Sequence, residues 1–157
     1  MNPLCPDAAT GRLDGRRHHY PVRVYYEDTD AAGVVYHSRY LHFLERARTE
    51  MLRCLGMPHA QMVADFGTMF ALRRCELDFI GPARLDDSLE IETGLVELRG
   101  ASLCLGQTIR RGSDHLVEAV VRLACITASG RPARMPAVVS RHLRRLLPPM
   151  IDDQKIN

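Results

Sequence analysis

A short polar stretch around residue 30 carries the side chains of this chain that are best suited to chemistry. Its members are Glu27, Asp28, Asp30, Gly33, His37 and Ser38. A carboxylate can act as a general base or as a nucleophile, and histidine can hold or transfer a proton near neutral pH. An acidic residue just before a helix can equally serve only as a cap that the helix dipole favours. The residue types alone leave both interpretations open.

Metal chemistry is not indicated by the spacing of the candidate ligands. His37 and His42 are five residues apart, which does not place them on one helix face. The 5 cysteines contain no Cys-x-x-Cys pair, so neither a zinc site nor a redox dithiol is predicted. We expect reduced thiols, no metal and no cofactor.

The polar stretch lies between a predicted strand and a predicted helix. Residues 22–26 are β-branched and aromatic, which favours a strand. Between Ser38 and Gly56 apolar residues recur every three or four positions, which predicts a helix with Ser38 as N-cap and Gly56 as the residue after its end. The candidate residues therefore precede the first turn of a long helix.

The rest of the chain predicts an antiparallel sheet. Four further strands are expected near residues 68–80, 88–98, 102–111 and 115–127, separated by glycine-containing turns. One strand, one long helix and four strands form an α+β pattern, in which the sheet wraps around the helix. Such a sheet has an edge strand and an open face, so we expect self-association.

The two ends of the chain are expected to lie outside this core. Residues 1–19 are rich in polar residues, Pro and Gly, and predict a flexible N-terminal extension. Residues 136–157 predict a C-terminal tail with a short basic helix near 140–147. The core domain is thus expected to span residues 20–135.

Composition limits the classes of function. Hydrophobic residues make up 46% of the chain and charged residues 25%, which is ordinary for a single soluble domain. A net charge of +2 and an aromatic content of 6% give no basis for a nucleic-acid partner. No segment resembles a signal peptide or approaches the length of a membrane span. We expect a cytoplasmic protein without integral membrane contact.

The order of residues in the polar stretch closely resembles the signature of the 4-hydroxybenzoyl-CoA thioesterase family. The run YYEDTDAAGVVYH at residues 25–37 carries the resemblance. Residues 45–52, 82–87 and 98–103 look like the branch of acyl-CoA thioesterases encoded beside the Tol-Pal envelope genes. The resemblance implies a hotdog fold, hydrolysis of acyl-CoA, and a homodimer or homotetramer. Acyl carrier protein is a further candidate partner.

The resemblance also implies roles for individual residues. Asp30 takes the position of the carboxylate that hydrolyses the thioester, as general base or nucleophile. The backbone N–H of His37 polarises the carbonyl, in keeping with the free donors of a helix N-terminus, and Gly33 lets the chain approach the ligand closely. Further substrate-binding candidates are Tyr36 and Ser38 at the helix start, and Arg84 and Arg99 for the phosphates of coenzyme A.

Two alternatives stay open beside hydrolysis. A hotdog hydratase or dehydratase would use a histidine with a carboxylate for proton transfer, and a non-catalytic acyl-CoA-binding protein would keep only the fold. The acyl preference is also open: the side chains that could line an acyl tunnel, or simply belong to the core, are Met69, Phe70, Leu72 and Phe79.

Overall fold

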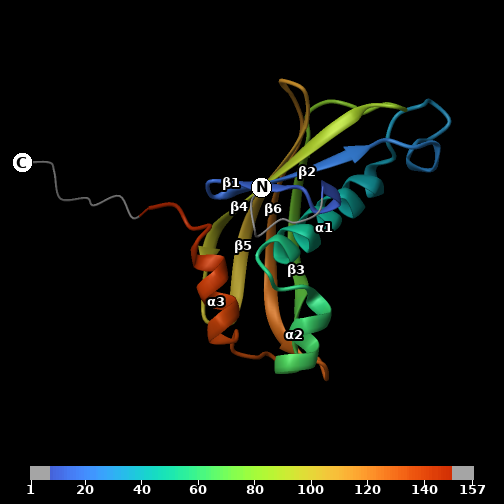
Figure 1. Ribbon diagram of the computed structural model, residues 1–157. Helices are drawn as coiled ribbons and strands as arrows, with labels where there is room; N and C mark the ends of the chain where they lie inside the picture. Colours follow the sequence, from blue (N-terminus) through green and yellow to red (C-terminus); the bar gives the residue numbers. More distant parts are fainter. Residues whose placement is uncertain (1–7, 150–157) are drawn as a thin grey trace, which may run out of the picture.

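An antiparallel sheet of six strands wraps around one long helix in a computed structural model that describes residues 8–149 (Figure 1). The strands lie in the order β1-β2-β4-β5-β6-β3, so β3 forms one edge. This arrangement confirms the predicted α+β pattern. The elements in chain order are η1 (Ala8–Thr10), β1 (Arg12–Asp14), β2 (Arg17–Arg23), η2 (Tyr26–Asp28), α1 (His37–Cys54), α2 (His59–Phe66), β3 (Thr68–Phe79), β4 (Ser88–Leu98), β5 (Ser102–Arg111), β6 (Asp114–Thr127) and α3 (Ala137–Arg144).

Strands β3 to β6 lie where the sequence predicts them, within one residue at each end. In β4 the inward residues Leu89, Ile91 and Leu95 are buried against α1, whereas Glu90 and Glu92 lie on the opposite face. This alternation is the period-two pattern of a half-buried antiparallel strand. The sheet therefore has an inner face on the helix and an outer face open to solvent.

Helix α1 presents its apolar side to the inner face of the sheet. Tyr40, Leu44, Ala47 and Met51 are all buried there. The helix begins at His37, two residues earlier than a Ser38 cap would require, and its N-cap is Tyr36, which makes no side-chain cap hydrogen bond. The first backbone N–H groups of α1 are consequently not satisfied by a cap side chain.

The N-terminal strand differs from the prediction. Strand β2 spans Arg17–Arg23, and residues 24–26 have already left the sheet. Pro21 lies past His19, the last residue of β2 that pairs with β1, so β2 is an edge strand at this position. An edge strand tolerates proline, which has no N–H to donate. Residues 12–19, expected in a flexible extension, instead belong to the β1–β2 hairpin. Residues 1–7 of that extension lie outside the described residues.

The hairpin is anchored by His18, which lies in the segment predicted to be a flexible extension. His18 is fully buried, and its Nε2 lies 2.8 Å from the carbonyl oxygen of Thr10. Burial lowers the pKa of His18 below its ordinary value, with the Thr10 hydrogen bond opposing this. His18 is therefore a neutral core residue at physiological pH.

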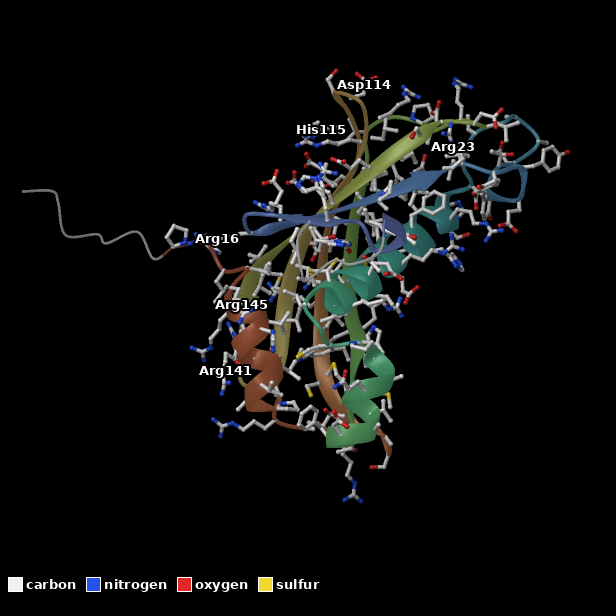
Figure 2. All side chains as sticks on the ribbon, viewed as in Figure 1. Arg16, Arg23, Asp114, His115, Arg141 and Arg145 are labelled. Carbon is white, nitrogen blue, oxygen red and sulfur yellow. The ribbon has the colours of Figure 1, made fainter. Side chains whose placement is uncertain are left out.

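Two short helices complete the fold. Helix α2 was not predicted, because eight residues between Pro58 and Gly67 are too short for a clear helical period. Helix α3 starts three residues before the expected basic helix and packs through Val139 and Leu143. Figure 2 shows Arg141 and Arg145 on the side of α3 turned away from the sheet. The last part of the predicted tail, residues 150–157, lies outside the described residues. Within residues 8–149, no helix has the length and apolar character needed to cross a membrane.

Candidate active site

The loop between β2 and α1 holds Asp30 in a fixed orientation. Its Oδ1 accepts hydrogen bonds from the backbone N–H groups of Ala32, at 2.8 Å, and Val34, at 3.4 Å. The Asp30 N–H donates to the Val34 carbonyl at 2.9 Å, which closes the loop. The side chain is exposed to solvent. Asp30 is thus a positioned carboxylate that an incoming ligand can reach.

Gly33 makes the turn that returns the chain from Asp30 toward the helix. Its φ of +75° lies in the left-handed region, where a side chain costs about 1–2 kcal/mol. Just after this turn, the Val35 N–H donates to the Ala83 carbonyl at 2.8 Å. The glycine therefore allows the loop to close against the segment that follows β3.

Asp28 has a different environment from Asp30. It is only 3% exposed, and its Oδ2 accepts the Tyr25 N–H at 2.9 Å. Its Oδ1 lies 3.7 Å from Nε of Arg39, and its carbonyl accepts the Tyr36 N–H at 2.9 Å. Asp28 therefore fastens the loop to the first turn of α1 and holds the helix start in place.

An apolar cleft of about 290 Å³ opens beside the start of α1. The exposed His37 ring lies at its mouth and stacks at a tilt on Tyr36, with ring centroids 4.3 Å apart. The N-terminus of α1, with its partial positive charge, lies beside this cleft, since His37 and Tyr40 of the first turn line it. The lining residues are Val35, His37, Tyr40, Phe79, Ile80, Gly81 and Pro82.

Tyr40 forms the floor of the cleft. Its hydroxyl accepts the Ala83 N–H at 2.9 Å, and its ring contacts Phe79 with centroids 5.6 Å apart. Burial raises the pKa of the Tyr40 phenol, although the Ala83 hydrogen bond opposes this. Tyr40 therefore stays neutral and acts as a fixed wall.

The structure brings Arg84 to the loop but keeps Arg99 far from it. Arg84 is the bridge partner of Val34, so it lies beside the Asp30 turn. Arg99 follows the opposite end of β4, which is roughly 30 Å away at about 3.3 Å per strand residue. Arg99 lies instead at a groove of about 490 Å³ together with Arg134, Arg141 and Arg144. One protomer therefore does not unite the two predicted phosphate ligands.

The predicted acyl-lining residues are also separated. Phe79 lines the cleft beside His37, whereas Met69, Phe70 and Leu72 lie farther back along β3. Ile80, Gly81 and Pro82 line the cleft but were not predicted to do so. The Gly-Pro pair directly after the apolar end of a strand could have indicated that the chain is exposed there. Among residues 8–149, no cluster of three potential metal ligands occurs.

Comparison with known proteins adds to this geometry. Residues 24–143 match the family model described as the thioesterase-like superfamily. The chain belongs to the thioesterase-like superfamily. A Haemophilus influenzae relative named acyl-CoA thioesterase YbgC is 41% identical over 128 residues, which cover 81% of this chain and 94% of the relative. An Escherichia coli relative named acyl-CoA thioester hydrolase YbgC is 47% identical over 108 residues, covering 68% and 80% of the two chains.

Solved structures confirm the hotdog fold of this superfamily member. A probable thioesterase from Bartonella henselae superposes with a TM-score of 0.74 at 40% identity, covering 76% of this chain and 99% of that one. A hypothetical protein from Thermus thermophilus gives a TM-score of 0.77 at 34% identity, covering 82% and 98%. The family resemblance seen in the sequence is thereby confirmed.

Proposed function

We propose that this protein hydrolyses acyl-CoA thioesters to a free acid and coenzyme A, with Asp30 as the catalytic carboxylate. The observation that carries the proposal is the position of Asp30 on a loop closed against the uncapped start of α1, beside an apolar cleft. The relatives named acyl-CoA thioesterases support the substrate class.

The reaction assigns a separate task to each part of the loop. As general base, Asp30 takes a proton from water while the water oxygen attacks the thioester carbonyl carbon. The His37 N–H donates to the carbonyl oxygen as it becomes an oxyanion, which is worth about 3 kcal/mol for a well-placed donor. The C–S bond then breaks, and the thiolate of coenzyme A leaves and takes up the proton. Gly33 leaves room for the substrate. Tyr36 and Ser38 flank the substrate at the start of α1.

A nucleophilic route uses the same groups differently. The Asp30 carboxylate would attack the carbonyl itself, expel the thiolate and form a mixed anhydride, which water then hydrolyses. We favour the general-base route, because no second side chain of the loop motif is placed to activate that water. Single-turnover hydrolysis in ¹⁸O-labelled water separates the routes. Label only in the acid product supports the general base, whereas label in Asp30 contradicts it.

A homodimer would complete the coenzyme A site. Strand β3 is a twelve-residue sheet edge that exposes Leu72 and Phe79, as expected of a strand that pairs with another chain. Antiparallel pairing of β3 with its copy would place the Arg99 end of one sheet near the Asp30 end of the other. We therefore assign Arg84 of one protomer and Arg99 of its partner to the phosphates, and expect either a dimer or a tetramer of two dimers.

The proposal is tested by incubating the protein with a panel of acyl-CoAs and measuring both free thiol and hydration of enoyl-CoA. Release of free thiol from saturated acyl-CoA is the expected result. Addition of water to enoyl-CoA without thiol release would favour the hydratase alternative. Binding without any turnover would favour the non-catalytic alternative. The same assay with acyl carrier protein thioesters tests whether acyl carrier protein is a further partner that supplies the acyl group.

A further inference from the structure

A second segment of the chain, residues 83–85, pairs with the loop that carries the proposed catalytic carboxylate. The Val35 N–H donates to the Ala83 carbonyl at 2.8 Å. The Leu85 N–H donates to the Gly33 carbonyl at 3.3 Å. The loop and this segment therefore form a short antiparallel ladder.

Val34 joins this ladder to Asp30. It is the bridge partner of Arg84 in the second segment. The Val34 carbonyl accepts the Asp30 N–H at 2.9 Å, and the Val34 N–H donates to Oδ1 of Asp30 at 3.4 Å. A shift in the backbone of Arg84 would therefore move the residue that orients the Asp30 carboxylate.

Asp87 fixes the backbone of the second segment. Its Oδ2 accepts the Arg84 N–H and Nη1 of Arg111, each at 2.8 Å. Partial burial disfavours the charged form of Asp87, but the hydrogen bonds from Arg111 and Arg84 outweigh it and lower the pKa of Asp87 below its ordinary value. Asp87 is therefore ionised at neutral pH. The exposed side chain of Asp86, inside the same turn, takes no part in these two bonds.

Arg111 attaches Asp87 to the sheet. It is the last residue of β5, a strand that pairs with β4 on one side and β6 on the other. Its Nη1 also donates to the Pro82 carbonyl at 3.4 Å, and its Nη2 lies 3.4 Å from Oδ2 of Asp114. One guanidinium therefore contacts the Asp87 carboxylate and the backbone just before Ala83.

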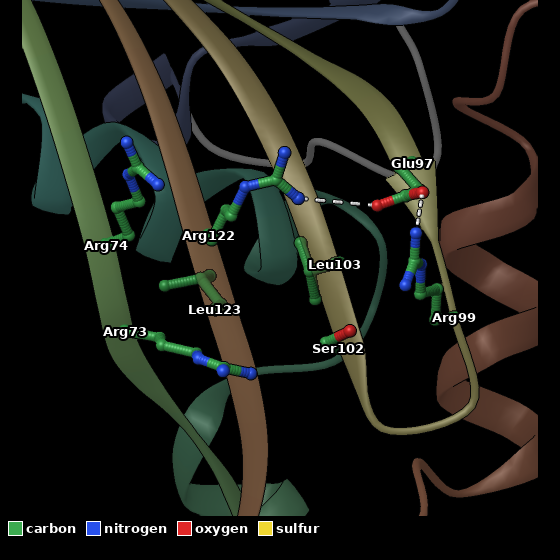
Figure 3. A pocket seen from close by; sticks show the side chains of 8 residues that line it. All are labelled: Arg73, Arg74, Glu97, Arg99, Ser102, Leu103, Arg122 and Leu123. Carbon is green, nitrogen blue, oxygen red and sulfur yellow. Dashed lines mark hydrogen bonds and ion pairs between the residues drawn. The ribbon is translucent and has the colours of Figure 1, made fainter.

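Another ion pair, near the other end of β4, illustrates how a side-chain contact differs from a backbone anchor. Figure 3 shows Glu97, which accepts from the side chains of Arg99 at 2.8 Å and Arg122 at 3.5 Å. The Asp87 carboxylate accepts from a side chain and from a backbone N–H at once. Loss of the Asp87 carboxylate would therefore release a main-chain segment.

We propose that Asp87 is a positioning residue for Asp30. Arg111 holds the Asp87 carboxylate, Asp87 holds the backbone of Arg84, and the ladder holds the loop that orients Asp30. Asp87 thus acts through the loop and not on the substrate. Its effect on catalysis rests on the proposed hydrolysis by Asp30, whereas its support of the loop does not.

Two substitutions at Asp87 separate its hydrogen bonds from its charge. Asp87→Asn removes the charge but keeps an oxygen that can accept the Arg84 N–H, as asparagine does in turns. Asp87→Ala removes the acceptor as well. Glu50→Ala is the matched control, because it removes an ion pair with Arg53 of similar length, 2.7 Å, near the other end of α1.

Hydrogen exchange, measured by mass spectrometry on peptides covering residues 29–36, reports the order of the loop without reference to activity. The Val35 N–H is protected by its bond to Ala83, so a loosened segment should exchange faster. We expect exchange about 10-fold faster in Asp87→Ala, close to the original rate in Asp87→Asn, and unchanged in Glu50→Ala. A peptide from the centre of β5 should keep its rate in all variants, which shows that the fold is intact. Unchanged loop exchange in Asp87→Ala would overturn the proposal.

Steady-state kinetics tests the consequence for catalysis. We expect Asp87→Ala to lower kcat by about 10- to 100-fold with KM changed by less than about 3-fold, because a displaced catalytic group loses rate more than binding. Asp87→Asn should recover most of kcat. The variant with both Asp87→Ala and Arg111→Ala should lose little more than Asp87→Ala alone, since the two residues act through one contact.

Two kinetic results would contradict the positioning role. Native kcat in Asp87→Ala would show that Asp30 does not depend on Asp87. Equal losses of kcat in Asp87→Asn and Asp87→Ala would show that the charge of Asp87 matters and not its hold on the backbone. If the original protein releases no thiol from any acyl-CoA, the proposed hydrolysis fails. The exchange rates then decide by themselves whether Asp87 supports the loop.

Discussion

At the scale of single residues, two neighbouring carboxylates have different environments. Asp28 and Asp30 are separated by one residue and were grouped together by the sequence pattern. Asp28 is buried against the backbone of Tyr25 and the side chain of Arg39, whereas Asp30 is exposed at the tip of the loop. The spacing of Asp28 and Asp30 could not predict this difference in burial, because Asp28 ends the 3₁₀ turn η2 whereas Asp30 lies in the loop that follows it.

Asp28→Ala should lower the free energy of unfolding by about 1–3 kcal/mol, because it leaves the Tyr25 N–H without its acceptor and removes the carboxylate that forms an ion pair with Arg39. Urea denaturation followed by circular dichroism measures the change. Asp65→Ala, which removes an exposed acidic side chain on α2, is the control. An unfolding midpoint in Asp28→Ala equal to that of the original protein would contradict the structural role of Asp28.

At the scale of elements, the sequence predicts the helices and strands that have a regular apolar period and clear turn residues at their ends. The bounds of β4 and β5 agree with prediction because their alternation is regular and glycine-containing turns separate them. The bounds of strand β2 could not be predicted from the sequence, because Pro21 suggests a strand boundary and His18, although buried, suggests a polar terminal segment. The helix start near His37 was predicted, but the cleft beside it is formed by residues distant in sequence.

The buried His18 predicts a loss of stability at acidic pH. Burial lowers its pKa in the folded protein, so the unfolded chain binds a proton near the ordinary value of 6.5 while the folded chain does not. The free energy of unfolding should therefore fall as pH drops below about 6.5, by up to ~1.4 kcal/mol per pH unit from this group. Burial lowers the pKa of His59 too, which adds to the same trend.

Urea unfolding at pH 7.5, 6.5 and 5.5 measures this dependence. His18→Gln retains a side-chain amide that can donate to the Thr10 carbonyl but cannot titrate. The variant should lose less stability between pH 6.5 and 5.5 than the original protein. Equal losses in the two proteins would show that His18 does not contribute to the pH dependence.

At the scale of the whole molecule, the sequence predicts the architecture and the need for a partner but not the surfaces involved. An antiparallel sheet around one helix followed from the order of the strands and the helix. The strand predicted at residues 88–98 already separates Arg84 from Arg99, whereas the bridge that brings Arg84 to Val34 is known only from the structure.

The protein should sediment as a dimer or a tetramer at micromolar concentration, because β3 is a long open edge of the sheet. Sedimentation velocity measures the mass directly. A single species of 17.7 kDa, the mass of one chain, would contradict pairing through the β3 edge.

The carboxylate of Asp30 provides the most direct test of the proposed hydrolysis. Asp30→Asn preserves size but removes the charge needed by a base or nucleophile. Asp86→Asn, at an exposed acid in the neighbouring loop, is the matched control. The measurement is kcat for thiol release from an acyl-CoA that the original protein hydrolyses, with melts confirming that both variants are folded. We predict that Asp30→Asn lowers kcat by about 10²–10⁴-fold, whereas Asp86→Asn does not. Near-native turnover in a folded Asp30→Asn protein would contradict the assignment of Asp30.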